Sequence, residues 1–259
     1  MNPRLPLPST PLLILPCLAF LVLVAPVTAQ DRVQDNSGKA RVVDDKTAKQ
    51  LLKDEKEALG SKEPRVRKEA LERLAKYSNE ALIATFTSAL KDRDPRVVVA
   101  SIQAMANQPG GKAQSNLLRL LKNKKIIGDE ALSAEVIRAL GVTGWDKRAY
   151  ATLRDFYDDA APKAKKELLR AFTAQKEIQS FSLFVDNLDE PRPKDVNAPN
   201  NPPASYWKAK YKEWTFIKSE VRRGLEAVSG RKFENAAEAR SWAKTREARK
   251  LKIRYKSGG

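Results

Sequence analysis

Paired carboxylates are the side chains of this sequence best suited to bind a metal ion or to act as general acid and base. Three such clusters occur: Asp92 with Asp94, Asp129 with Glu130, and Asp158 with Asp159. All three fall near expected helix starts or in turns between helices, where acidic residues cap the helix and interact favourably with its dipole. We therefore expect them to stabilise helices, and we predict no catalytic and no metal-binding residue among them.

Residue types that many hydrolases and zinc proteins need are missing. The sequence has no histidine, and its single cysteine, Cys17, lies in an N-terminal apolar stretch. The rest of the chain therefore cannot form a Ser-His-Asp triad, a thiolate nucleophile, or a zinc site of imidazole and thiolate ligands. Gly110-Gly111 is not followed by the Lys-Ser or Lys-Thr of a phosphate-binding loop. The sequence thus indicates a protein that is not an enzyme, with no cofactor and no evident small-molecule substrate.

The C-terminal fifth of the chain is strongly basic. Residues 206–256 contain 16 Lys and Arg against 6 Asp and Glu, whereas residues 30–205 contain 32 against 26. This asymmetry suggests an anionic partner, which could be a nucleic acid, a membrane surface or an acidic polymer. The alternative is a solvated basic surface that only aids solubility. The candidate residues for contact with an anionic partner are Lys208, Lys212, Arg222, Arg223, Arg231, Lys232, Arg240, Lys244, Arg246, Arg249 and Lys250.

Aromatic and basic residues alternate at the start of this basic region. One stripe at helical spacing contains Tyr206, Trp207, Tyr211, Trp214 and Ile217, with lysines between them. We expect this stripe to pack against the preceding helices while the lysines remain on the outer face. The alternative is a surface on which bases or sugars stack beside positive charge.

A short pattern that occurs four times predicts the elements that position these residues. Segments 71–75, 102–106, 137–141 and 169–173 align position by position, and their first residues are 31, 35 and 32 residues apart. Such a period is typical of a helical solenoid, in which each unit buries its apolar face only against its neighbours.

The apolar pattern predicts a pair of helices in each repeat unit. The expected first helices lie around 66–74, 97–105, 132–140 and 162–172, and the second helices around 82–90, 117–121, 150–157 and 178–188. Turns are expected at 109–111 and 141–144, where glycines cluster. A lone helix from Asp44 to Gly60 is expected to cap the first open end.

Several of these residues resemble the HEAT repeat. Asp94-Pro95-Arg96-Val97 and the following apolar and alanine residues look like the first helix of such a repeat, and Ala139-Leu140-Gly141 matches its ending. The third unit departs from the pattern, because Gly128-Asp129-Glu130 replaces Asp-Pro. The resemblance spans residues 62–188 and implies a right-handed α-solenoid used for binding. Residues 225–233 together with Trp242 resemble the closing unit of exported bacterial HEAT proteins, although the usual second tryptophan is missing.

The N-terminus has the features of a secretory signal peptide. Arg4 precedes an apolar stretch from Leu12 to Val24, and Val27-Thr28-Ala29 supplies the small residues of a cleavage site. The alternative is a retained membrane anchor, which the prolines in the stretch disfavour. Residues 1–29 are therefore interpreted as a signal peptide and residues 30–43 as a flexible arm.

Taken together, the sequence predicts an all-α protein, a right-handed solenoid of about four HEAT-like helix pairs with helical caps. Repeats are expected over 44–188, a Pro-rich loop over 189–204, and a helical cap with a basic tail over 205–259.

The expected function is an exported scaffold, periplasmic or secreted, that binds a protein partner in the bacterial envelope. The alternative is a binder of an anionic polymer, either nucleic acid or an acidic envelope component, through the basic C-terminal region. An enzyme would require a cleft in which a carboxylate or lysine is buried beside another polar group.

Overall fold

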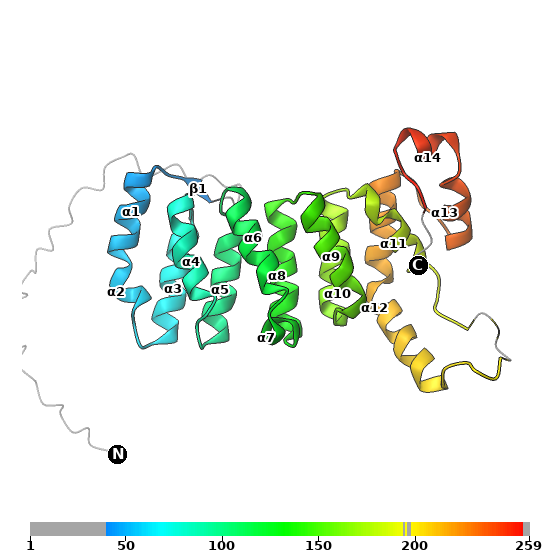
Figure 1. Ribbon diagram of the computed structural model, residues 1–259, viewed down its shortest axis with the longest axis horizontal. Coiled ribbons are helices and arrows are strands. Elements are labelled where there is room, and N and C mark those ends of the chain that lie inside the picture. The colour runs from blue at the N-terminus through cyan, green and yellow to red at the C-terminus, as the bar shows by residue number, and fades with distance from the viewer. Residues whose placement is uncertain (1–39, 194, 196–197, 256–259) are drawn as a thin grey trace, which may run out of the picture. The chain divides into compact units, whose positions relative to one another are not determined.

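A computed structural model describes residues 40–193, 195 and 198–255, which lie in one compact unit. The predicted signal peptide and residues 30–39 of the predicted arm lie outside the described residues. The described part is nearly all-α, and in Figure 1 the helices follow one another in chain order. Its first half comprises α1 (Asp45–Asp54), α2 (Lys56–Leu59), α3 (Pro64–Leu74), η2 (Glu80–Leu82), α4 (Ile83–Ala89), α5 (Pro95–Ala106), α6 (Gly110–Leu120) and α7 (Lys124–Ile127). Its second half comprises α8 (Glu130–Thr143), α9 (Lys147–Asp159), α10 (Pro162–Ala174), η3 (Ile178–Ser180), α11 (Phe181–Asp186), α12 (Ala204–Ser229), α13 (Ala236–Trp242) and α14 (Arg246–Lys250).

The helices begin where the sequence provides caps. Asp94 precedes α5, and its side chain accepts a hydrogen bond from the backbone N–H of Arg96 at 2.9 Å. Proline opens α3, α5 and α10, at a position where no backbone N–H is needed. Asp129 caps α8 by accepting hydrogen bonds from the N–H groups of Ala131 and Leu132. The acidic residues at these positions therefore act as helix caps, as we expected.

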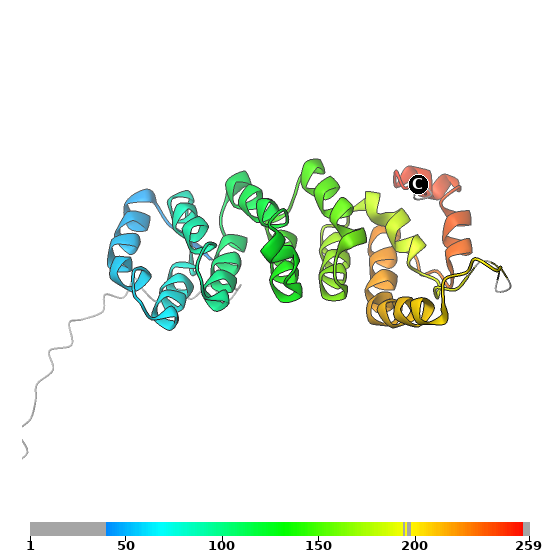
Figure 2. The ribbon, with the colours of Figure 1, turned by 60° about the horizontal axis from the view of Figure 1, so that its bottom comes forward.

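The first helices of successive units pack directly against one another. The contacts run from α3 to α5, from α5 to α8, from α8 to α10 and from α10 to α12. In Figure 2 these helices lie side by side, with α4, α6, α9 and α11 in a second layer above them. The residue that opens the repeated pattern is fully buried in all four segments that carry it: Leu71, Ile102, Ile137 and Leu169. The period in the sequence therefore marks the buried contact between neighbouring first helices.

Two predicted turns are wrong in detail. Gly110 and Gly111 were expected in a turn, but they form the first residues of α6, and Gly110 has a positive φ of 79°. Gly141 was also expected in a turn, but α8 continues to Thr143 and the chain turns at Gly144, which has a φ of 73°. A Cβ built on Gly141 would lie 3.2 Å from the Cβ of Ala171 in α10. Gly141 therefore serves a close helix–helix approach rather than a turn.

The end of the predicted flexible arm is part of the fold. Arg41–Val42 forms strand β1, which pairs in parallel with strand β2 at Tyr77–Ser78. The backbone N–H of Arg41 donates to the carbonyl of Lys76 at 2.8 Å. The prediction of a flexible arm is therefore wrong at residues 41–42, because free backbone groups after α3 are available to pair with this segment.

A ladder of charged side chains links three of the first helices. Each carries a glutamate three residues before an arginine: Glu135 and Arg138 in α8, Glu167 and Arg170 in α10, and Glu220 and Arg223 in α12. Each arginine pairs with the glutamate of its own helix. Arg138 also lies 3.3 Å from Glu167, and Arg170 lies 3.0 Å from Glu220, so the pairs continue from helix to helix. The carboxylates are largely buried and the guanidinium groups are about half exposed.

The C-terminal region departs from this regular succession. Between α11 and α12, the described residues of 187–203 contain neither helix nor strand. Beyond α12, the side chains of Phe233 and Trp242 pack with Phe181 of α11, with ring centroids 5.4–6.3 Å apart. Ile253 is fully buried, and the Tyr255 hydroxyl donates to Asp186 at 2.7 Å. The region expected to be a basic tail is therefore packed against α11 as far as Tyr255.

Gly224 in α12 provides a test of the close packing in this region. A Cβ at this position would lie 2.3 Å from the ring of Phe184, which is itself fully buried. We expect Gly224→Ala to lower the free energy of unfolding by about 3 kcal/mol, because neither the helix nor the ring can move without disturbing other buried groups. Urea denaturation followed by circular dichroism measures this change.

The matched control is Gly111→Ala in α6, where an added Cβ has no neighbour within 4 Å. Since alanine favours helix over glycine, this variant should be as stable as the parent or up to about 0.5–1 kcal/mol more stable. Equal destabilisation by the two substitutions would contradict the packing argument.

The cap of α5 predicts how stability depends on pH. Hydrogen bonds from Arg96 lower the pKa of Asp94 from 3.8 to about 2. The ionised form of Asp94 therefore stabilises the fold above its unfolded pKa, and this contribution is lost as the pH falls from about 4 towards about 2. We expect Asp94→Asn, which can still cap the helix, to reduce the loss of unfolding free energy over this range in acid denaturation. An unchanged pH dependence in the variant would show that Asp94 does not contribute to it.

Candidate functional site

The first half of α12 extends beyond the helices that cover its second half (Figure 1). Ile217 is buried as expected, and Trp207 and Trp214 are partly exposed. Tyr206 is 44% exposed and Tyr211 is 46% exposed, so the prediction that the whole stripe packs against preceding helices is wrong for these two residues. The helical face is continuous, but the neighbouring helices cover only its C-terminal part.

Lysines lie over the aromatic rings of this exposed half. The ammonium group of Lys210 is 5.9 Å from the ring centroid of Tyr206, and that of Lys218 is 4.9 Å from Trp214. Lys166 of α10 lies 4.5 Å from Phe216, which is 41% exposed. These cation–π contacts fix the positions of long side chains and keep positive charge beside apolar surface.

An open cleft of about 1320 Å³ lies beside this part of α12. One wall is the segment from Asp186 to Pro193, and another is formed by Lys210, Glu213, Trp214 and Ile217 of α12. The indole N–H of Trp214 donates to the carbonyl of Leu188 at 3.3 Å, which holds the start of the Pro-rich segment against the helix. The cleft therefore combines an aromatic and apolar wall with a mixture of acidic and basic groups.

A buried ion pair lies on the side of the cleft formed by α10. The ammonium group of Lys165 lies 2.7 Å from Glu213, and the side chain of Lys165 is 10% exposed. Lys165 also lies 5.5 Å from the ring of Tyr157, and burial raises the pKa of the Tyr157 hydroxyl well above its usual value. This cleft meets the condition stated for an enzyme, a lysine buried beside another polar group. However, Lys165 is held in an ion pair with Glu213, and the raised pKa of Tyr157 keeps its hydroxyl protonated, which argues against this tyrosine as a general base.

The three carboxylate clusters have structural partners, but the expected capping role is wrong for Asp158 and Asp159, because they are the last two residues of α9. Asp92 forms an ion pair with Arg67 at 2.7 Å, and this hydrogen bonding lowers the pKa of Asp92. Glu130 accepts a hydrogen bond from the backbone N–H of Lys163 at 2.9 Å, and Asp158 pairs with Arg154 at 3.1 Å. Within the described ranges, no group of three or more acidic residues could hold a metal ion.

The structure divides the eleven candidate cationic residues between several places. Lys208, Lys212, Arg222 and Arg223 lie on α12, Arg231 and Lys232 lie between α12 and α13, and the other five lie on α13, α14 and the turn between them. Four form ion pairs: Arg223 with Glu220, Arg231 with Glu247, Lys232 with Glu226, and Arg240 with Asp186. The other seven form no ion pair with an acidic residue of the described part. The structure thus does not bring all eleven onto one surface.

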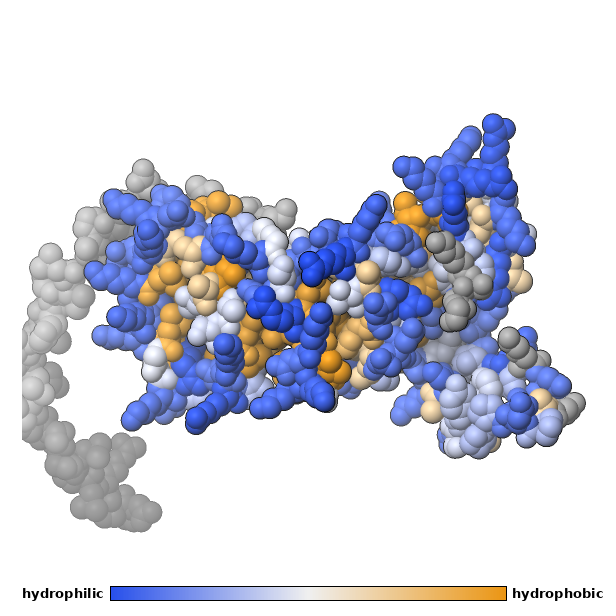
Figure 3. Space-filling view, in the orientation of Figure 1, coloured by the Kyte–Doolittle hydropathy of each residue, from blue (hydrophilic) through white to orange (hydrophobic). Residues whose placement is uncertain are grey.

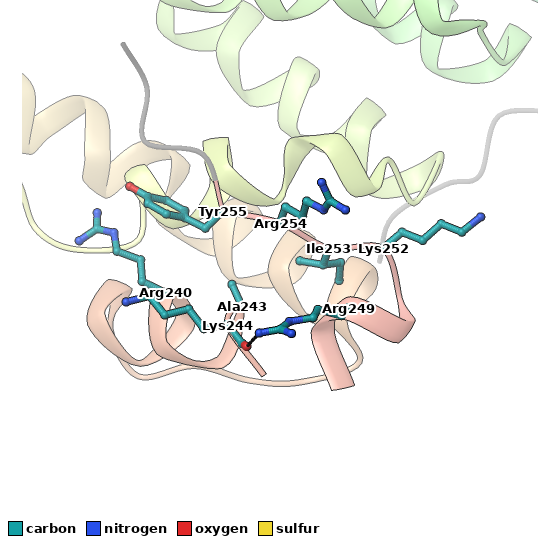
Figure 4. A pocket seen from close by; sticks show the side chains of 8 residues that line it. All are labelled: Arg240, Ala243, Lys244, Arg249, Lys252, Ile253, Arg254 and Tyr255. Carbon is teal, nitrogen blue, oxygen red and sulfur yellow. Dashed lines mark hydrogen bonds between the residues drawn. The ribbon is translucent and has the colours of Figure 1, made fainter. Parts of the chain in front are cut away.

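A depression of about 780 Å³ lies between α13, α14 and the segment that follows them (Figure 4). It is lined by three of the candidate residues, Arg240, Lys244 and Arg249. Lys252, Arg254 and Tyr255 also line it, although the list of candidates drawn from the sequence omitted them. Their basic and aromatic character was visible in the sequence, but only the fold of the C-terminal segment brings them back beside α13.

Comparison with known proteins supports the resemblance over part of the chain. Residues 50–126 match the family model of HEAT repeats, a range that includes α3, α4, α5 and α6. No curated protein matches the sequence. HEAT-repeat proteins generally act as protein-interaction scaffolds and are typically not catalytic. None of the helices in the described part of the chain is both long enough and apolar enough to cross a membrane.

The Lys165–Glu213 pair yields a test of its structural role. We expect Lys165→Met to lower the free energy of unfolding by about 2–3 kcal/mol, because Glu213 would lose its partner in a largely buried place. The double variant Lys165→Met/Glu213→Leu should recover at least about 1 kcal/mol of this loss, since no unpaired charge remains. Urea denaturation of the parent, the single and the double variant measures both effects. A double variant that is no more stable than the single variant would contradict this assignment.

Proposed function

We propose that this protein is a non-catalytic scaffold that binds a partner protein at its C-terminal region. Its helices would form a right-handed HEAT-like solenoid of about four pairs with helical caps. We also propose that it is exported by its N-terminal segment and works in the bacterial envelope, as a periplasmic or secreted protein. The match of residues 50–126 to HEAT repeats supports the scaffold role, because such repeats commonly mediate protein–protein interaction.

The observation that carries this proposal is the uncovered aromatic surface of α12. Tyr206 and Tyr211 each expose more than two-fifths of their surface along one stripe of the helix, next to Trp207 and Trp214, whereas Phe216 lies on another side of α12 beside Lys166. Tyrosine and tryptophan are enriched among residues that dominate the binding energy of protein interfaces, because each buries a large area and also offers a polar group. We therefore assign the first half of α12 as the main contact surface.

The neighbouring cleft supplies a second part of this surface. Its volume of about 1320 Å³ is large enough for an extended segment of a partner chain. Trp214 and Ile217 would contact apolar side chains of that segment, whereas Lys210 and Glu190 would pair with its charged groups. The mixture of both signs of charge in the cleft fits a peptide better than it fits a uniformly anionic ligand.

An enzymatic role is less well supported by the same cleft. Its buried lysine is paired with Glu213, and its residues include neither histidine nor cysteine. The alternative, a binder of an anionic polymer, concerns basic residues that are spread over α12, α13, α14 and the turns between them.

Site-specific photo-crosslinking in the native host tests the proposed contact surface. With p-benzoylphenylalanine in place of Tyr211, we expect an adduct of defined mass, because this ring is exposed on the proposed contact helix. Replacement of Val142, which is 65% exposed at the end of α8, is the control and should not yield that adduct.

A second variant measures the contribution of the other exposed tyrosine of this stripe. In the Tyr211-labelled chain, Tyr206→Ser should reduce the yield of the adduct at least tenfold, since loss of an interface anchor of this kind weakens binding by about 2 kcal/mol. Equal labelling from positions 211 and 142, or no adduct from position 211, would overturn the proposed surface.

A further inference from the structure

We propose that α13, α14 and the segment that follows them bind the anionic headgroups of a lipid bilayer surface. This inference goes beyond the proposed protein scaffold, because it concerns a different surface and a different kind of partner. The surface is called the cationic end and is defined by Lys244, Arg246, Arg249, Lys250, Lys252 and Arg254. All six side chains are exposed.

Positive charge at the cationic end is not compensated by the protein. None of its six residues forms an ion pair with any acidic residue of the described part. The one acidic residue within its span, Glu247, already accepts hydrogen bonds from Arg231 at 3.0 Å and from the indole N–H of Trp242 at 3.1 Å. Figure 3 shows hydrophilic side chains gathered over this end of the molecule. A dense group of unpaired cations produces a strong local potential, which favours contact with an anionic surface.

The cationic end is held by a packed framework rather than carried on a loose tail. Ala248 and Ile253 are fully buried, and Thr245 caps α14 through a hydrogen bond with the N–H of Ala248. The backbone N–H of Ile253 donates to the carbonyl of Ala248 at 2.9 Å, which closes the end of α14. Because these contacts fix the backbone, the cations remain clustered without help from a ligand.

The directions of the side chains favour a surface over a single small anion. In Figure 4 the charged groups of Lys252 and Arg254 extend in different directions instead of converging on one point. Such an arrangement suits contact with separate phosphate groups, as the headgroups of a bilayer provide. A binding site for one free phosphate would instead direct its donors towards a common centre.

Leu251 distinguishes a bilayer from a nucleic acid. It is 42% exposed and lies between Lys250 and Lys252, so an apolar side chain is flanked by cations. At a bilayer, the leucine can enter the interface while the lysines contact the headgroups. Single-stranded nucleic acid would instead need exposed aromatic rings for stacking, whereas Phe233 and Trp242 are buried against Phe181 and the partly exposed ring of Tyr255 has Arg240 5.2 Å from its centroid.

Lys252 has an unusual backbone for a lysine. Its φ is +58°, in the left-handed region that glycine occupies without strain. Lys252→Gly should therefore remove a cation without weakening the end of α14. The substitution Lys252→Gly can therefore be included in a variant that must remain folded.

Flotation of the full chain with lipid vesicles tests the inference. The probes are vesicles of phosphatidylcholine alone and vesicles with 30% phosphatidylglycerol, at 0.1 M salt. Vesicles of phosphatidylcholine alone set the baseline, because an apolar segment could enter them regardless of charge. We expect binding above this baseline only to the anionic vesicles.

The triple variant Lys244→Gln/Lys250→Gln/Lys252→Gly should lower this anionic binding by about 100-fold, since each cation near an anionic bilayer contributes about fivefold.

The matched control removes three cations elsewhere. Lys122, Lys124 and Lys125 are exposed around α7 and form no ion pair within the described part of the chain. Their replacement by glutamine makes the same change in net charge and should lower anionic binding less than fivefold. Leu251→Ser should lower it by about three- to tenfold with the charge unchanged.

Three results would overturn the inference. They are equal losses in the two triple variants, no binding to anionic vesicles above the baseline, or tighter binding to a single-stranded DNA oligonucleotide than to the vesicles at the same salt concentration. The last result would assign the cationic end to a nucleic acid. None of them bears on the crosslinks from Tyr211, so failure of this inference and failure of the proposed scaffold are distinguishable.

Discussion

The structure depends on one constraint, which is that each pair of helices can bury its apolar face only against the next pair. The first helices must therefore approach closely and in register along the whole succession. Leu71, Ile102, Ile137 and Leu169 are fully buried at these contacts. The approach is so close that Gly141 faces Ala171, and Gly224 faces the ring of Phe184. Small residues stand at these positions because a larger side chain would separate the helices and expose the apolar contact between them.

The ladder of glutamates and arginines works together with this apolar packing. The largely buried carboxylate of Glu167 receives Arg170 from its own helix and Arg138 from the preceding one, so that its charge is not left unpaired. Ion pairs with defined partners add to the register that closely packed apolar side chains already impose. Because removing one partner would leave a buried charge, the ladder favours a single register between α8, α10 and α12.

The same constraint explains why the functional surfaces lie at the C-terminal end. The last long helix, α12, is followed in the described part by only two short helices, α13 and α14, which in Figure 1 lie towards its second half. The aromatic face of its first half consequently remains exposed, and the cleft forms where the Pro-rich segment leaves α11. The cations of α13 and α14 lie at the other side of this closing unit, so one end of the chain presents an aromatic surface and a basic one.

Much of the fold could be predicted from the sequence, because the information is local. The buried positions recur at a period of about 33 residues, and Asp94-Pro95 specifies a helix start through contacts within one turn. Side-chain chemistry also indicated the basic character of the C-terminal region.

Three features could not be predicted in this way. They are the exposure of Tyr206 and Tyr211, the pairing of Arg41–Val42 with Tyr77–Ser78, and the pair formed by Lys165 and Glu213. The last two join residues 36 and 48 positions apart, and all three depend on how elements that are distant in the sequence pack against one another. The sequence determined which faces are apolar and which are charged, and only the tertiary structure decided which of them are covered, because coverage depends on the lengths and packing of other elements.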